Sequence, residues 1–194
     1  MNGHSENLKI PMSVFFSCLN CPIKYNLRYE TKIADSLMAG VGFGTASGII
    51  TTLGMIVGLY SSSSDRLAII GGIFTVSVAD ALSDALGEHI SEESKKHPSI
   101  VDVRNITIST FFSKLLIGLS FVIPFILLPI NSAVVISVIY SALVLTMLSL
   151  RISKRTGQNR YEVITEHLLI GLAVVIITFF LGKWVETAFD NTSL

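Results

Sequence analysis

The sequence has few charged residues and almost no cysteine. Only 14% of its 194 residues are charged, against about 25% in a typical soluble domain. Its two cysteines, Cys18 and Cys21, cannot form a framework of disulfides. The formal net charge is zero, so there is no basic excess that would indicate nucleic acid as a partner. Residues 1–35 lack a basic segment followed by an apolar one, so we expect no secretory signal peptide.

The sequence motifs of common catalytic chemistries are also missing. There is no Gly-rich phosphate loop, no H-E-x-x-H pair and no nucleophile with a base and an orienting acid at a recognisable spacing. We therefore expect that the protein is not an enzyme and that it holds no resident cofactor.

Long apolar runs dominate the sequence instead. Hydrophobic residues make up 51% of it, and the mean hydropathy is +0.66. Each run is close to the ~20 residues that cross about 30 Å of hydrocarbon as a helix. The predicted spans are residues 36–60, 67–91, 106–128, 133–150 and 165–188. The sequence thus predicts an all-α integral membrane protein with five transmembrane helices, and a tight turn at Pro129 and Asn131 between the third and fourth spans.

Three regions follow from this pattern. Residues 1–35 are expected to form a cytoplasmic or interfacial segment, because their apolar stretch is too short to span a bilayer. Residues 36–189 form the predicted membrane domain, and residues 190–194 form a C-terminal tail. The bilayer itself is therefore one predicted partner.

Basic residues gather on one side of the predicted membrane. They lie before the first span, between the second and third, and between the fourth and fifth: Lys9, Lys24, Arg28, Lys32, Lys95, Lys96, Arg104, Arg151, Lys154, Arg155 and Arg160. The other side has only Arg66 and Lys183. The positive-inside rule places the N-terminus in the cytoplasm and the C-terminus outside. The brevity of the chain favours a prokaryotic plasma membrane, or a vacuolar-type membrane in a eukaryote.

Acidic residues gather at the cytoplasmic end of the second predicted span. Asp80, Asp84, Glu88 and Glu92 are spaced by four, which places them on one slowly drifting helix face. Acids within a span are costly and usually face the bundle interior or a water-filled cavity. Glu92 and the adjacent Glu93 fall at the membrane interface as entry charges. The deeper acids each need a cation, a proton or a basic side chain.

Two interpretations of the deeper acids are open. Lys114, about two turns inside the third span, is a possible structural partner for Asp84 or Glu88, although one lysine cannot neutralise every acid. We favour a pathway for divalent cations or protons, in which clustered acids exchange a proton for a cation. His89 points about 100° away from Glu88, and we expect it to be an ordinary interfacial residue. The predicted metal ligands are Asp84, Glu88, Asp80, Ser47, Met55 and Glu92.

The first predicted span carries a ladder of small residues, Gly40, Gly44 and Gly48. Such a ladder lets helix backbones approach closely in lipid. It predicts either packing within one chain or a homodimer through this face. Ser47, Thr51 and Met55 form a second line at the same spacing, and we expect Ser47 to lie at about the depth of Asp84.

Residues 47–52 (SGIITT) and 81–91 (ALSDALGEHIS) resemble the vacuolar iron transporter family, over about residues 36–189. The resemblance implies five spans, a cytoplasmic N-terminus, and a homodimer whose pore lies between the two first spans. It also implies a proton-coupled exporter that moves Fe²⁺ or Mn²⁺ out of the cytoplasm. The metal would then be the substrate rather than a resident cofactor.

The chain departs from the family at the implied site. The family usually has Asp-Gly at Ser47-Gly48 and Ser-Met at Ser83-Asp84, and plant-type members insert a long metal-binding segment after the second span. One carboxylate is therefore lost at Ser47 and one gained at Asp84. If these residues face each other, the site keeps its charge. Loss of the thioether favours harder ions such as Mn²⁺ or Fe²⁺, and leaves Mg²⁺ and Ca²⁺ open as alternatives.

Several further positions have an ordinary structural interpretation as well as a functional one. The Cys18–Cys21 spacing suits a metal, but a zinc site needs a second pair. Glu166 and His167 open the fifth span, and Glu186 and Asp190 close it, where acids could gather or release cations. The competing hypothesis for the whole chain is a membrane interaction or scaffold protein that keeps the fold without transport.

Overall fold

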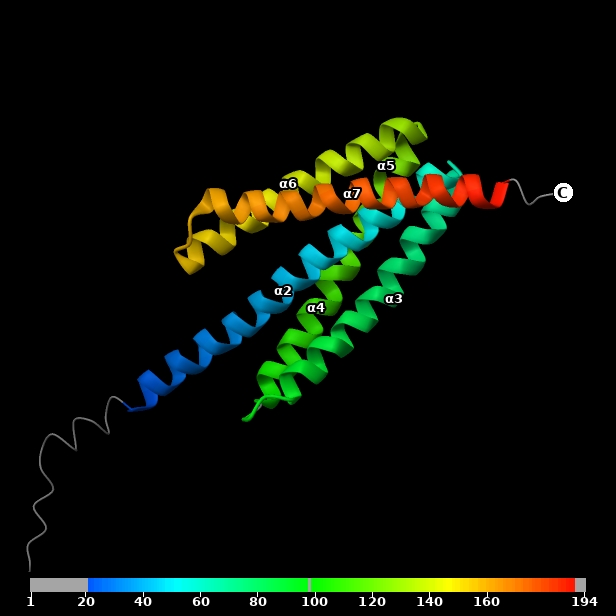
Figure 1. The fold of residues 1–194 in the computed structure, drawn as a ribbon. Helices are drawn as coiled ribbons and strands as arrows, with labels where there is room; N and C mark the ends of the chain where they lie inside the picture. The colour runs from blue at the N-terminus through cyan, green and yellow to red at the C-terminus, as the bar shows by residue number, and fades with distance from the viewer. Residues whose placement is uncertain (1–20, 98, 191–194) are drawn as a thin grey trace, which may run out of the picture.

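The structure is a computed structural model that describes residues 21–97 and 99–190. Within these ranges it is a set of helices without strands (Figure 1). The helices are α2 (Cys21–Ser62), α3 (Arg66–Glu93), α4 (Ile100–Ser120), α5 (Val122–Leu127), α6 (Ile130–Thr156) and α7 (Arg160–Asp190).

Five helical segments are long and apolar enough to cross a membrane. They are Thr31–Ser62, Arg66–Glu93, Ile100–Leu127, Ile130–Thr156 and Arg160–Phe189. The prediction of an all-α membrane protein with five spans is therefore confirmed. The orientation of the termini stays a prediction.

The third predicted span begins earlier than expected and contains a break. α4 starts at Ile100, where the Ser99 side chain accepts a hydrogen bond from the backbone of Asp102. The helix is interrupted at Phe121, whose N–H bonds to Gly118 O at 3.1 Å. Pro124 accounts for this interruption, because a proline lacks an N–H and its ring clashes with the carbonyl four residues earlier. The expected tight turn is present, since only Leu128 and Pro129 separate α5 from α6.

The first span is one part of a longer helix. α2 runs without interruption from Cys21 to Ser62, so the predicted boundary between residues 35 and 36 falls inside it. Asp35 forms an ion pair with Arg155, near the end of α6. Residues 1–20, including Cys18, lie outside the described residues, as does the tail from residue 191.

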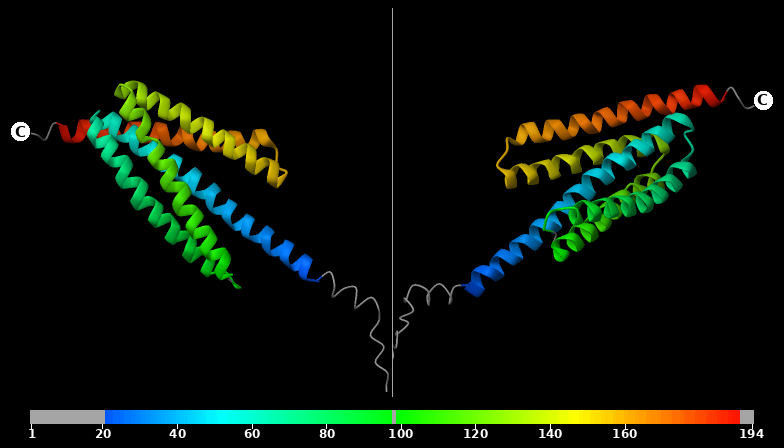
Figure 2. Two further views of the ribbon diagram at one scale, coloured as in Figure 1. Left: turned by 180° about the vertical axis from the view of Figure 1, so that it is seen from behind. Right: turned by 60° about the horizontal axis from the view of Figure 1, so that its bottom comes forward.

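α2 is the central helix of the bundle. The α3–α4 hairpin packs against one side of it and the α6–α7 hairpin against another, and the hairpins spread apart toward one end (Figures 1 and 2). We call that end the basic end, because Lys95 after α3, Arg104 near the start of α4 and Arg155 near the end of α6 lie there. The opposite end, with the α2–α3 turn and α5, is the far end.

An apolar core fills the bundle toward the far end. It joins side chains from α2, α3, α5, α6 and the break before α5: Ile49, Ile56, Ile69, Ile73, Phe121, Val122, Phe125, Ala133, Val134 and Leu145. The outer faces are apolar as well, as the stripe Phe74, Val78, Leu82, Leu86 and Ile90 along α3 illustrates. Apolar faces on both sides of a helix fit a bundle surrounded by lipid.

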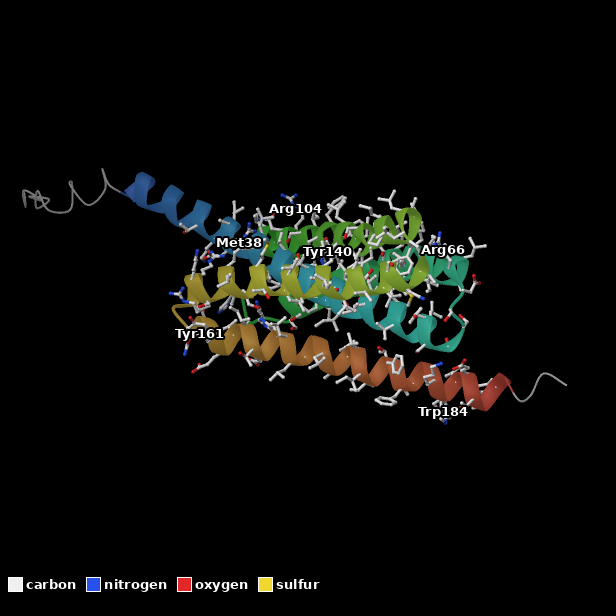
Figure 3. All side chains as sticks on the ribbon, turned by 90° about the horizontal axis from the view of Figure 1, so that it is seen from above. Met38, Arg66, Arg104, Tyr140, Tyr161 and Trp184 are labelled. Atoms are coloured by element: carbon white, nitrogen blue, oxygen red, sulfur yellow. The ribbon has the colours of Figure 1, made fainter. Side chains whose placement is uncertain are left out.

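Aromatic residues mark the two ends of α7. Tyr161 lies near its start and Trp184 near its end, both pointing outward (Figure 3). They are 23 positions apart, which corresponds to about 35 Å of helix, close to the distance between the two interfaces of a bilayer. Tyrosine and tryptophan concentrate at these interfaces.

The glycine ladder of α2 is used within the chain. A Cβ on Gly40 would lie 2.0 Å from Ser109 Oγ, and one on Gly44 would lie 2.1 Å from Ser113 Oγ. At Gly48 the nearest atom would be Ile117 Cγ2, at 2.5 Å. The ladder thus packs α2 against α4, which is the first of the two predicted alternatives. A homodimer through the same face would have to displace α4, so we do not propose this interface, and homodimerisation itself stays a prediction.

Candidate functional site

A buried lysine lies between two aspartates in the α2–α3–α4 half of the bundle. Lys114, on α4, has only 2% of its side chain exposed. Its Nζ lies 2.7 Å from Asp80 Oδ2 and forms a second ion pair with Asp84 Oδ2. Both aspartates come from α3, where their spacing of four directs them to one face. We call Lys114, Asp80, Asp84 and Ser47 the lysine centre.

Ser47 joins the lysine centre from α2. Its hydroxyl donates a hydrogen bond to Asp84 Oδ2 at 2.6 Å and accepts one from Lys114 Nζ at 2.8 Å. Three helices therefore meet through charged or charge-assisted contacts, the strongest class of hydrogen bond in proteins. Ser47 and Asp84 thus lie at similar depth, as expected, and they face each other, which the sequence left as a condition.

The glycine ladder explains how the lysine reaches this position. Lys114 Cγ lies 3.2 Å from the place where a Cβ on Gly48 would be. The aliphatic stem of the lysine thus lies against the bare backbone of α2, and its ammonium extends past it toward α3. A larger residue at Gly48 would occupy the space that the stem uses. The glycine at position 48 is therefore what allows Lys114 to reach the aspartates of α3.

The lysine centre has an imbalance of charge. Two carboxylates face one ammonium, so the formal charge is −1 when all three groups are ionised. The aspartate side chains are 27% and 21% exposed, far more than that of the lysine. Asp80 Oδ2 touches Lys114 Nζ but is a buried atom without a hydrogen bond of good geometry in the described chain. A net buried charge is unfavourable, so the centre is suited to take up a further proton or cation.

The remaining acids of α3 continue from the centre to the basic end. Glu88 is partly buried and has no hydrogen bond or ion pair with any described residue. Glu92 pairs with Lys95 in the connection that follows. His89 Nε2 lies 3.3 Å from Glu93, and its Nδ1 lies 3.2 Å from Thr107 Oγ1. His89 is thus engaged outside the centre, in agreement with the interfacial role expected for it.

Met55 lies apart from the acids. Its Sδ is 2.8 Å from the place where a Cβ on Gly72 would be, so it packs against the far-end half of α3. Gly72 and Asp84 are separated by 12 residues, or about 18 Å along the helix. Met55 therefore shares the helix face of Ser47 but not its depth, and it contributes no soft ligand to the lysine centre.

The predicted metal ligands do not converge into a preformed metal site. Among the described residues, no group of three His, Cys, Asp or Glu side chains could hold a metal ion. The structure instead brings Ser47, Asp80 and Asp84 together around Lys114, and leaves Glu88 and Glu92 on the way to it. The sequence offered Lys114 as a structural partner for Asp84 or Glu88. In the structure it pairs with Asp84, and its second partner is Asp80 rather than Glu88.

The other candidate positions lie outside the lysine centre. His167 Nδ1 is 2.7 Å from Ser149 Oγ, which joins α7 to α6 near the basic end. Glu166 is exposed beside it. Glu186 pairs with Lys183 at 2.7 Å near the end of α7. The side chains of Cys21 and Asp190 lie outside the described part of the structure.

Comparison of the chain with protein-family models and with curated proteins finds no match. The class that the described fold itself defines is a membrane protein of five helical spans, with a lysine held between two aspartates among the first three. The resemblance to the vacuolar iron transporter family stays a prediction from the sequence.

Proposed function

We propose that the protein is a transporter that moves a divalent transition-metal cation, Fe²⁺ or Mn²⁺, out of the cytoplasm in exchange for protons. The observation that carries the proposal is the burial of Lys114 between Asp80 and Asp84 inside a membrane bundle. Ionisable residues within spans are costly and mark ion pathways and proton relays. A lysine ammonium is itself a cation, and it occupies the position that a transported cation would take.

Charge balance explains how the exchange would work. A divalent cation between Asp80 and Asp84 neutralises both carboxylates, so the neighbouring ammonium of Lys114 is no longer stabilised and releases its proton to the cytoplasm. When the centre opens to the other side, a proton returns to Lys114 from that side, and the metal leaves. One proton therefore enters for each metal that is exported, and Lys114 carries it.

The acids at the basic end supply an entry route. In the predicted orientation this end faces the cytoplasm, and Glu92, Glu88 and Asp84 follow one another along α3 at intervals of about 6 Å. Glu88 has no competing ion pair among the described residues. A cation drawn to Glu92 thus meets an unpaired carboxylate next, and then the lysine centre.

The donor atoms favour relatively hard ions. Ser47, Asp80 and Asp84 offer oxygen only, and the thioether of Met55 lies away from them. Carboxylate and hydroxyl oxygens suit Mn²⁺ and, among softer metals, Fe²⁺ better than Cu⁺. The proposed substrates are accordingly Mn²⁺ and Fe²⁺.

A scaffold protein without transport is the second candidate. The observation that favours it is the same ion pair, since a lysine held by two aspartates and a serine also fastens α2, α3 and α4 together. In that case the centre would be structural, and no ion would replace the ammonium. The two candidates differ in whether wild-type protein moves metal at all: a transporter needs Asp84 for uptake, whereas a scaffold needs it only for stability.

Metal uptake by purified protein in proteoliposomes separates the two candidates. We expect uptake of Mn²⁺ and Fe²⁺, with less Co²⁺ and Zn²⁺, when a proton gradient is imposed in the opposite direction. Asp84→Asn should reduce uptake to the level of empty vesicles, because the centre can no longer bind a divalent cation with two carboxylates.

Asp102→Asn is the matched control. Asp102 also accepts a hydrogen bond from a serine of α2, Ser36 Oγ at 2.7 Å, but it lies at the basic end. It should therefore keep wild-type uptake. Transport is excluded if wild-type protein moves none of the four metals under either direction of the gradient. That result would favour the scaffold. Full uptake by Asp84→Asn would instead show that the lysine centre is not the transport site.

A further inference from the structure

A second polar cluster lies next to the lysine centre, on its far-end side. Ser77 is on α3, one turn before Asp80 in the chain, and only 2% of it is exposed. Its hydroxyl is buried and has no hydrogen-bond partner among the described residues. Asp80 Oδ2 is also buried, and its one polar contact within the described chain is the ion pair with Lys114. Buried polar atoms almost always have partners, so the unpaired hydroxyl of Ser77, one turn from Asp80, needs an explanation.

Three helices meet at the hydroxyl of Ser77. A Cβ on Gly118 of α4 would lie 2.4 Å from Ser77 Oγ and 3.4 Å from Thr52 Oγ1 of α2. The two hydroxyls therefore converge over the bare backbone of Gly118. Gly118 follows Lys114 by four residues, and Thr52 follows Ser47 by five, so the whole cluster is displaced toward the far end by about one turn.

The apolar core begins directly beyond this cluster. On each helix, a fully buried apolar residue lies three or four residues farther toward the far end. These residues are Ile73 beyond Ser77, Ile56 beyond Thr52, and Phe121 beyond Gly118. On α2, α3 and α4, fully buried apolar side chains thus lie directly beyond the cluster on its far-end side. A cation leaving the lysine centre outward would have to stop here.

We propose that Asp80, Ser77 and Thr52 form a second subsite for the transported divalent cation, outward of Lys114. This inference rests on the proposed function. One carboxylate and two hydroxyls form an oxygen-only set that suits a hard divalent cation such as Mn²⁺. Asp80 is shared by both sites, so a cation can pass from the lysine centre to the outer subsite without leaving this carboxylate. The cation then waits beneath the apolar core until the bundle opens outward.

Ser77→Ala tests the outer subsite in Mn²⁺ uptake by proteoliposomes over a series of Mn²⁺ concentrations. We expect the maximal rate to fall about tenfold, as for the loss of one ligand interaction of about 1.4 kcal/mol. The KM for Mn²⁺ should stay within about twofold, because Asp84 still binds the entering cation. Thermal stability should be unchanged or higher, because the variant removes a buried hydroxyl that has no partner.

Ser137→Ala is the matched control. Ser137 is equally buried, but its hydroxyl donates to Ala133 O of its own helix at 2.8 Å. It should keep the wild-type rate. Thr52→Val, which preserves shape and removes the second hydroxyl, should lower the maximal rate in the same way as Ser77→Ala and decides the matter if Ser77→Ala does not fold.

The outcomes distinguish this inference from the proposed function. If wild-type protein transports Mn²⁺ and both hydroxyl variants match Ser137→Ala, the outer subsite is wrong while transport stands. A rise in KM without a fall in maximal rate would also overturn it, because the hydroxyls would then belong to the entry site. If wild-type protein moves no Mn²⁺, the proposed function fails, and the subsite fails with it.

Discussion

Hydroxyl groups on the two sides of α2 differ in their partners. On α6, the buried Ser141 donates to Ser137 O of its own helix at 2.7 Å. Toward α3 and α4, Ser47 bonds across the interface to Asp84 and Lys114, and Ser77 bonds to nothing described. The first arrangement needs only its own helix. The second depends on where three helices and their charges lie.

The difference separates a structural side from a candidate functional side. A serine that bonds to the carbonyl four residues earlier behaves as a small, self-satisfied residue that lets helices approach. The α3–α4 side instead holds two carboxylates around one lysine, and at Ser77 a buried hydroxyl without a described partner. Such a centre is costly to keep in a membrane, and this cost is what the proposed exchange of cation and proton explains.

Removing the lysine should produce the largest effect. Lys114→Met leaves Asp80 and Asp84 facing each other without a counter-charge, and breaking a buried ion pair from one side costs about 3–5 kcal/mol. We expect a large fall in the thermal unfolding midpoint in detergent and loss of metal uptake. Lys183→Met is the control, because the Lys183–Glu186 pair is exposed and such pairs contribute about 0–1 kcal/mol. If both variants lowered the unfolding midpoint and metal uptake equally, the contrast between the two sides of α2 would be contradicted.

Removing one hydroxyl on each side should sharpen the comparison. Ser47→Ala loses hydrogen bonds to two charged groups, which are worth about 1.5–3 kcal/mol, and should slow metal uptake as well. Ser141→Ala loses only a bond within its own helix and should cost less than about 1 kcal/mol. Unfolding midpoints and uptake rates of the two variants provide the measurement. Similar behaviour of both would show that the position of a buried serine does not matter.

The close approach of α2 and α4 can be tested within one helix turn. A Cβ on Gly44 would lie 2.6 Å from the backbone carbonyl oxygen of Thr110, so Gly44→Ala forces the helices apart and should cost about 1–3 kcal/mol. Gly42 has no atom within 4 Å of such a Cβ. Gly42→Ala should therefore be neutral or stabilising by up to about 1 kcal/mol. Unfolding midpoints in the reverse order would contradict the described α2–α4 packing.

Hydropathy and helix period predict most of the fold. The five spans follow from apolar length alone, because a segment that crosses lipid must satisfy its own backbone. The break at Phe121 is less visible, since Pro124 marks it only indirectly. The glycine ladder correctly indicates close packing, but spacing does not name the partner helix. α4 supplies that partner through Ser109, Ser113 and Ile117.

The site was only partly predictable for a similar reason. Helical spacing places Asp80 and Asp84 on one face and Ser47 at their depth, and these relations are local or depend only on span direction. Met55 shares a face with Ser47, but eight residues along the helix carry it about 12 Å away. Lys114 reaches Asp80 as well as Asp84 because of the rotation of α4 and because the aliphatic stem of Lys114 lies over Gly48. Neither can be read from spacing. Nothing in the sequence indicates that Ser77 lacks a partner.

The most direct test of the central claim is coupled Mn²⁺ and proton movement in proteoliposomes of wild type and Lys114→Arg. Arginine keeps the positive charge beside Asp80 and Asp84 but cannot release its proton. We predict that wild-type protein moves protons against Mn²⁺, and that Lys114→Arg folds with an unfolding midpoint near that of wild type yet moves neither ion. Wild-type rates of Mn²⁺ and proton movement in Lys114→Arg would contradict the account, because Lys114 would then not carry the exchanged proton.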